Sequence, residues 1–127
     1  MAIRSNDDQF KILADNTNEE PFVMLNLLKF KKEGGGREAY LRYLKEASPF
    51  VEGVGAKLIY FGKPKELLNG TEQWDLLMLV QYPSRKAFLK MANNPDYLKV
   101  HKWREEGVER AVLFATDPAK PKDILSQ

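Results

Sequence analysis

Three side chains at helical spacing carry the chemistry that this sequence offers. Tyr97, His101 and Arg104 are four and three positions apart, so they share one face of a helix. They combine a hydroxyl, an imidazole that exchanges protons near neutral pH and a fixed positive charge. Such a set can hold and polarise a carbonyl, an enolate or a carboxylate. His101 would be the acid or base, and Arg104 would bind the oxyanion or carboxylate.

Asn26 adds an amide to this set. It interrupts the apolar run FVMLNLLKF, where an amide without hydrogen-bond partners costs about 1–3 kcal/mol. Either a neighbouring element satisfies this amide, or the amide lines a polar cavity and orients a substrate there. Tyr43 and Trp74 complete the candidate substrate-binding residues, with Trp74 walling the pocket mouth. As alternatives, Tyr43 is a core-edge residue with a hydrated hydroxyl and Trp74 is a packing residue.

The catalytic candidates also have interpretations without catalysis. A lone histidine on a helix is commonly a surface or core-edge residue, and His101 is the only histidine. Arg104 can instead form a surface ion pair with Asp75, with Asp96 or with a neighbour of Glu105. No nucleophile-elbow motif supports a Ser/His/Asp triad. The sequence therefore leaves open whether the protein is an enzyme.

Composition excludes several classes of function. With no cysteine, one histidine and no paired ligand spacing among Asp and Glu, we expect neither a metal nor a cofactor. The 20 basic and 18 acidic residues nearly cancel and are interspersed, which is unlike a nucleic-acid binder. No window of about 18 residues is apolar throughout, so we expect no membrane span. The opening MAIRSNDDQF has no long apolar run, so we expect a cytoplasmic protein without a signal peptide.

Apolar periodicity and turn signals predict the elements that position these residues. Strands are expected at residues 22–30, 56–61, 74–82 and 109–116, and helices at about 5–16, 37–52, 85–92 and 96–106. Pro49 should kink the second helix or restart it after Ser48. Ser84 should cap the third helix, and Asn94 with Pro95 should begin the last one as a separate piece.

This order of elements predicts an α+β fold. It is β-α-β-β-α-β behind an N-terminal helix, the ferredoxin-like pattern, in a single domain with its core at about 21–117 and a polar tail at 118–127. Right-handed crossovers place both helices of the repeat on one face of a four-stranded antiparallel sheet. The first and third strands are apolar nearly throughout, so the other sheet face needs cover. A homodimer through that face is the simplest solution.

The same segments resemble a known group of proteins. PFVMLNLLKFK, GAKLIYFG, WDLLMLVQYPSRKAFLKM, NPDY and HKWREEGVERAVLFA together are similar to the dimeric alpha-beta barrel superfamily, and most similar to a branch described as a domain of unknown function. The resemblance runs from about Pro21 to Asp117. It implies a protomer that dimerises through its sheet to form a barrel, a pocket between helices and sheet, and an arginine at the position of Arg104.

Two alternative functions follow, one from the Tyr97–His101–Arg104 face together with the resemblance, and one from the absence of a diagnostic catalytic motif. The superfamily includes cofactor-independent monooxygenases, muconolactone isomerases and haem-binding enzymes. His101 is the only candidate axial ligand for haem, but the chain lacks the extra length of the haem-binding members. One expectation is a cofactor-independent oxygenase, isomerase or lyase that acts on a ring or carbonyl compound. The other is a non-catalytic module that binds a small organic ligand or a partner.

Overall fold

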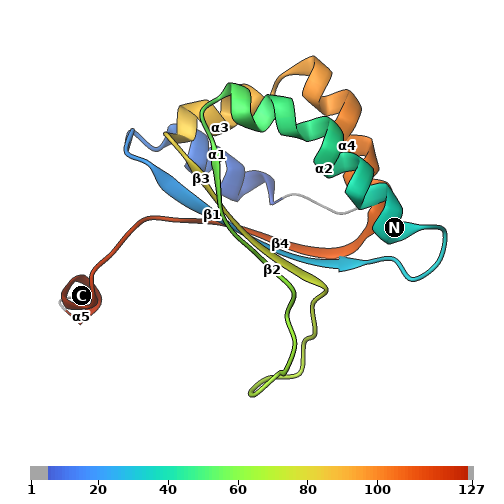
Figure 1. Cartoon of the computed structure of the whole chain (residues 1–127). Helices are drawn as coiled ribbons and strands as arrows, with labels where there is room; N and C mark the ends of the chain where they lie inside the picture. The colour runs from blue at the N-terminus through green and yellow to red at the C-terminus, as the bar shows by residue number, and fades with distance from the viewer. Residues whose placement is uncertain (1–5, 126–127) are drawn as a thin grey trace.

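A computed structural model of the chain, which describes residues 6–125, shows helices covering one face of an open four-stranded sheet (Figure 1). The elements in chain order are α1 (Asp7–Asp15), β1 (Phe22–Phe30), α2 (Gly36–Gly53), β2 (Lys57–Gly62), β3 (Leu76–Tyr82), α3 (Arg85–Ala92), α4 (Pro95–Gly107), β4 (Val108–Thr116) and α5 (Pro121–Leu125). The expected α+β, ferredoxin-like arrangement behind an N-terminal helix is confirmed. Ser5, which was expected in the first helix, lies outside the described residues.

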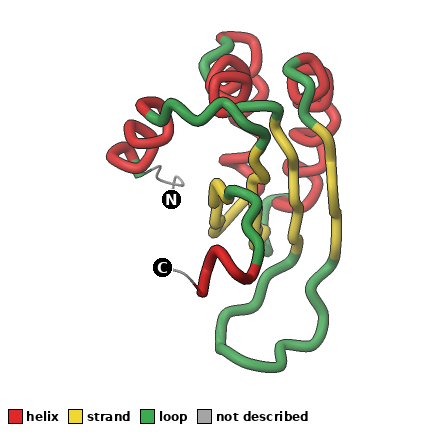
Figure 2. Tube along the Cα trace, turned by 90° about the vertical axis from the view of Figure 1, so that its left-hand side faces the viewer, coloured by secondary structure: helices red, strands yellow, loops and turns green. Residues whose placement is uncertain are grey.

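The strands lie in the order β2-β3-β1-β4, and every neighbouring pair is antiparallel. β1 is central, and its side chains alternate between buried and half-buried. The buried set packs against helix side chains, and because successive side chains of a strand alternate, the half-buried set lies on the opposite sheet face. The second face of β1 and β3 is therefore only partly covered within this chain. The β2–β3 connection extends away from the helices (Figure 2).

Two helix starts have the predicted caps. The Ser84 hydroxyl accepts a hydrogen bond from the Ala87 amide at 3.1 Å. The Asn94 side chain accepts one from the Asp96 amide at 2.9 Å, and Pro95 is the first residue of α4. Each cap satisfies an amide that has no partner within its helix. The break between α3 and α4 therefore follows from the local sequence.

Pro49 was expected to kink α2 or to restart it after Ser48, and the restart is wrong. The helix continues for 18 residues, with Pro49 inside it and exposed to solvent. A proline removes one helical amide, but on the outer side water can hydrate the carbonyl that loses its donor. Tyr43, before the proline, and Val51, after it, therefore belong to one continuous helix.

Some boundaries and the tail also differ from expectation. β3 begins at Leu76 rather than Trp74, because the Asp75 carboxylate accepts a hydrogen bond from the Phe30 amide at 2.9 Å. The Asp75 side chain thus takes the place of the backbone carbonyl that would accept from the Phe30 amide if the β1–β3 pairing continued. The polar tail contains the short helix α5, which lies away from the body of the protein in Figure 1.

A close glycine contact joins the start of α2 to the end of α4. The Lys31 amide donates to the Gly107 carbonyl at 3.0 Å. A Cβ on Gly107 would lie 2.5 Å from the Gly36 carbonyl oxygen, and a Cβ on Gly36 would lie 2.3 Å from the Lys31 carbonyl oxygen. Only glycine fits at both positions. This contact fixes the two helices that carry the candidate site side by side.

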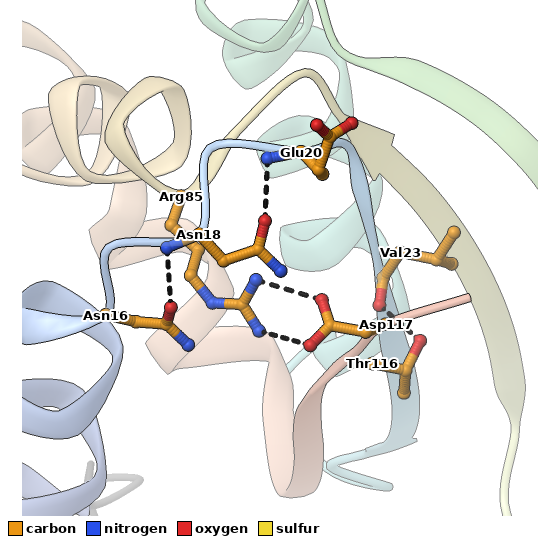
Figure 3. A network of polar contacts seen from close by, with 7 residues as sticks. All are labelled: Asn16, Asn18, Glu20, Val23, Arg85, Thr116 and Asp117. Atoms are coloured by element: carbon orange, nitrogen blue, oxygen red, sulfur yellow. Dashed lines mark hydrogen bonds and ion pairs between the residues drawn. The ribbon is translucent and has the colours of Figure 1, made fainter. Parts of the chain in front are cut away.

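An ion pair joins the start of α3 to the end of β4 (Figure 3). Arg85 is 7% exposed and donates to both carboxylate oxygens of Asp117, at 2.9 and 3.2 Å. Its guanidinium also lies 5.0 Å from the ring centroid of Phe22. Nearby, the Thr116 hydroxyl donates to the Val23 carbonyl at 2.7 Å. This buried arginine is fully paired.

Candidate functional site

A cavity of about 730 Å³ lies between the helices and the sheet. Most of its wall is apolar, from side chains of the helices and of the helix-facing side of the strands: Met24, Ala47, Val51, Met78, Val80, Phe88 and Met91. The volume falls within the range of roughly 300–1,000 Å³ that is usual for small-molecule sites. Five of the six predicted site residues line this cavity: Asn26, Tyr43, Tyr97, His101 and Arg104.

Arg104 is the buried cation of this cavity. Its residue is 9% exposed, in the last turn of α4. Across residues 6–125, no carboxylate lies within ion-pair distance of it and no group accepts a hydrogen bond from it. Asp96 pairs with Lys99 instead, and Asp75 accepts from the Phe30 amide. A buried charge is normally paired, so this guanidinium is available to an external anion.

His101 forms a pair with Glu105 at the wall of the cavity. Its Nδ1 lies 3.1 Å from a carboxylate oxygen of Glu105. Burial lowers the pKa of His101, the charge of Arg104 lowers it further, and Glu105 opposes both effects. The imidazole is therefore neutral at neutral pH. Because the carboxylate can only accept, the hydrogen is assigned to Nδ1, which leaves Nε2 as the basic nitrogen.

Two tyrosine hydroxyls meet beside the histidine. The oxygens of Tyr43 and Tyr97 are 2.6 Å apart, and the ring centroid of Tyr43 lies 6.2 Å from that of His101. Burial raises the pKa of both phenols, so both stay protonated at neutral pH. One hydroxyl hydrogen makes the mutual bond. In the described part of the chain the other has no acceptor.

Asn26 reaches the same cavity from the centre of the sheet. It is 8% exposed, and its register partner on β3 is Met78. Its amide donates to the Met24 carbonyl at 3.4 Å, which is long for such a bond. Within residues 6–125 the amide makes no other hydrogen bond. Asn26 thus remains largely unsatisfied by the protein.

Trp74 is not brought together with the other predicted residues. It lies before β3 and lines a separate hollow of about 470 Å³ near the start of α2. Lys31, Lys32 and Arg37 line that hollow as well. The Arg110 guanidinium lies 5.9 Å from the Trp74 ring. Trp74 lies outside the cavity because β3 begins two residues later than expected, at Leu76.

Sequence reasoning missed Glu105 as the partner of His101. The two residues are four positions apart on α4, a spacing that places side chains in contact on a helix. That signal was present in the sequence. The apolar wall residues Met24, Phe88 and Met91 were not among the predicted site residues, because spacing does not distinguish a core residue from one that lines a cavity.

Comparison with known proteins places the chain in a family. The sequence pattern of a family described as Domain of unknown function (DUF1330) matches residues 32–117. This chain belongs to the DUF1330 family. No curated protein matches it. In residues 6–125, no helix of this DUF1330 protein is both long and apolar enough to cross a membrane.

Several solved structures are similar to this DUF1330 protein. A protein of unknown function from Rhodopseudomonas palustris is 32% identical, with a TM-score of 0.87 over 94% of this chain and 98% of that one. A protein from Arabidopsis thaliana is 14% identical, with a TM-score of 0.62 over 78% and 96%. A dimeric ferredoxin-like protein of unknown function from Bacteroides fragilis is 11% identical, with a TM-score of 0.55 over 77% and 96%. The last two share the fold alone with this DUF1330 protein.

Proposed function

We propose that this DUF1330 protein binds a small ring or carbonyl compound in the cavity and removes a proton from it. Proton removal is a common first step of cofactor-independent oxygenases, isomerases and lyases. The observation that carries the proposal is the His101–Glu105 pair on the cavity wall beside the unpaired Arg104. It combines a neutral base, a carboxylate that orients it and a fixed positive charge.

The proposed step balances without an oxidant. Nε2 of His101 takes a proton from the carbon next to a carbonyl, and the C–H electron pair moves into the new carbon–carbon π bond. The carbonyl π electrons move onto oxygen, which gives an enolate. Arg104 stabilises this negative charge, and Glu105 stabilises the imidazolium. Where a carbon–carbon double bond is conjugated with the enolate, return of the proton to the far carbon of that bond isomerises the compound, whereas an oxygenase would next require O₂ as co-reactant.

Two of the remaining polar groups orient the substrate. Asn26 lies on the sheet and Tyr97 on α4, so they bound the cavity from opposite sides. Each has hydrogen-bonding capacity that the described protein leaves unused or weakly used. Placement between them would hold the reacting carbon in a fixed geometry, which is a large part of enzymatic rate enhancement.

Solvent-deuterium exchange tests the proposal. Phenylpyruvate and its neutral counterpart phenylacetone are incubated in D₂O, and loss of their enolisable protons is followed by proton NMR. We expect exchange above the buffer rate, reduced roughly 100-fold or more by His101→Gln, since general bases typically contribute 10²–10⁴. Lys99→Ala is the matched control on α4, with a side chain 80% exposed, and should exchange normally. Binding of these compounds without exchange would favour the alternative, a non-catalytic ligand-binding module.

We also propose that the protein is a homodimer through the outer face of its sheet, which would form the alpha-beta barrel. On that face Leu25 lies opposite Leu79 and Phe114 in the strand register. Phe114 is 61% exposed, and no described helix covers this face in Figure 1. An apolar sheet face of this kind marks an interface. The dimeric state of the Bacteroides fragilis neighbour agrees with the proposal.

Light scattering at micromolar concentration tests the homodimer. We expect a mass near twice the 14.6 kDa of one chain. Leu25→Lys should give a monomer, because it places a charge in the centre of the apolar face. Leu41→Lys is the control, since Leu41 is 54% exposed on α2, among the helices that cover the other sheet face. A monomer mass for the unsubstituted protein would rule the homodimer out.

A further inference from the structure

The α4 side of the cavity presents hydrogen-bond donors that lack acceptors. Arg104 has five N–H donors and no partner in the part of the chain described. The Tyr43–Tyr97 pair has one hydroxyl hydrogen without an acceptor. Both features are unusual in a protein interior, because buried polar groups normally find partners. An occupant with acceptor atoms would satisfy them.

The carboxylates that line the cavity do not fill this role. Glu105 contacts His101 and is 51% exposed. Glu52 accepts from the Ser48 hydroxyl at 3.4 Å, also at an exposed position. Neither lies within ion-pair distance of Arg104. The buried positive charge is thus not compensated by the cavity's own acids.

We infer that the natural ligand is an organic acid whose single carboxylate binds Arg104 and the free tyrosine hydroxyl, and whose apolar body fills the remaining cavity. This inference rests on the proposed function and deepens it by naming the substrate class of the same site. In a 2-oxo acid the carboxylate and the enolate oxygen are on adjacent carbons, so the guanidinium of Arg104 can contact both. A carboxylate offers two oxygens in the geometry of a guanidinium fork, with lone pairs left for a hydroxyl donor. One buried cation matches one negative charge. The second basic residue of the cavity, Lys57, lies at its exposed edge on β2.

The rest of the wall determines the body of the acid. Met24, Phe88 and Met91 are at most 5% exposed, and all three line the cavity. Methionine adapts its shape to flat rings and makes favourable sulfur–aromatic contacts. An aryl or branched alkyl group would therefore be accommodated there. The acid would lie with its polar end beside His101 and its apolar end over the sheet.

Calorimetric titration of three matched probes tests this inference. The probes are 3-phenylpropionate, 3-phenylpropanamide and phenyl phosphate. We expect the acid to bind at least tenfold tighter than the amide and tighter than the phosphate, because one cation pairs best with one charge. Arg104→Gln should reduce the preference for acid over amide to within about twofold. Arg42→Gln is the control, because its side chain is 56% exposed on α2, and should bind as the unsubstituted protein does.

Several results would overturn the inference. They are equal binding of acid and amide, tighter binding of the phosphate, unchanged acid binding by Arg104→Gln, or no binding of the acid at millimolar concentration. His101→Gln should retain acid binding, so the base and the anion site are tested separately. Acid binding that depends on Arg104, without exchange of any ketone, would uphold the inference and reject the proposed function. Exchange of phenylacetone that depends on His101 and Arg104, together with equal binding of the acid and the amide, would do the reverse.

Discussion

Arg104→Met should make the protein more stable while removing its affinity for acids. The substitution keeps an unbranched side chain of similar length and removes a charge that has no partner in the described structure. Taking an ion out of water costs several kcal/mol even after relaxation. A functional site commonly carries such a cost, and substitutions there often raise stability.

The magnitude follows from the burial of Arg104. Its residue is 9% exposed, but the guanidinium borders the cavity, which solvent can enter, so most of the desolvation cost is recovered. We expect the free energy of unfolding to rise by about 1–2 kcal/mol. For a chain of this size that corresponds to an increase in Tm of roughly 3–8 °C. Differential scanning calorimetry and urea unfolding at pH 7 both measure it.

Arg85→Met provides the matched control. Arg85 is buried to the same degree, 7% exposed, but it is paired with both oxygens of Asp117. Its replacement leaves that carboxylate without a partner, so we expect a loss of about 1–3 kcal/mol, tempered because Asp117 is 48% exposed. The reasoning is refuted if Arg104→Met loses more than about 1 kcal/mol, since Arg104 would then be a structural residue like Arg85.

Three further predictions concern the same helices. NMR titration should give His101 a pKa below 6.5. Between the folded-state pKa and 6.5 the unfolded chain then binds more protons than the folded protein does. The free energy of unfolding should therefore fall as the pH drops from 6.5 toward the folded-state pKa. Tyr97→Phe should cost about 1–3 kcal/mol in urea unfolding, and a double-mutant cycle with Tyr43→Phe should show coupling, because each hydroxyl is the other's partner. Gly107→Ala should cost more than about 2 kcal/mol in thermal unfolding, because its Cβ would meet the Gly36 carbonyl oxygen at 2.5 Å; Gly53→Ala, where a Cβ meets nothing within 4 Å, should not.

Much of the fold could be predicted because local signals agreed with it. The apolar run of residues 22–30, the caps Ser84 and Asn94, and Pro95 at a helix start each depend on neighbouring residues only. The restart at Pro49 was wrong because the effect of a proline depends on which side of α2 faces solvent, and that side is set by packing. Local chemistry therefore determined the elements but not all of their ends.

The candidate site could be predicted in part for the same reason. Helical spacing placed Tyr97, His101 and Arg104 on one face, and they line one cavity. Which groups this face contacts depends on the tertiary packing of the chain. So does the absence of an acidic partner for Arg104 among residues 6–125. Trp74 lines a different hollow, because β3 begins after Asp75, whose carboxylate accepts a hydrogen bond from the Phe30 amide.

The central claim is tested most directly by a structure of the protein with 3-phenylpropionate bound. The account predicts carboxylate oxygens about 2.7–2.9 Å from the Arg104 guanidinium nitrogens, with the phenyl ring against Met24 and Met91. The result that would contradict it is the acid bound in the hollow beside Trp74, with Arg104 left without a contact to it.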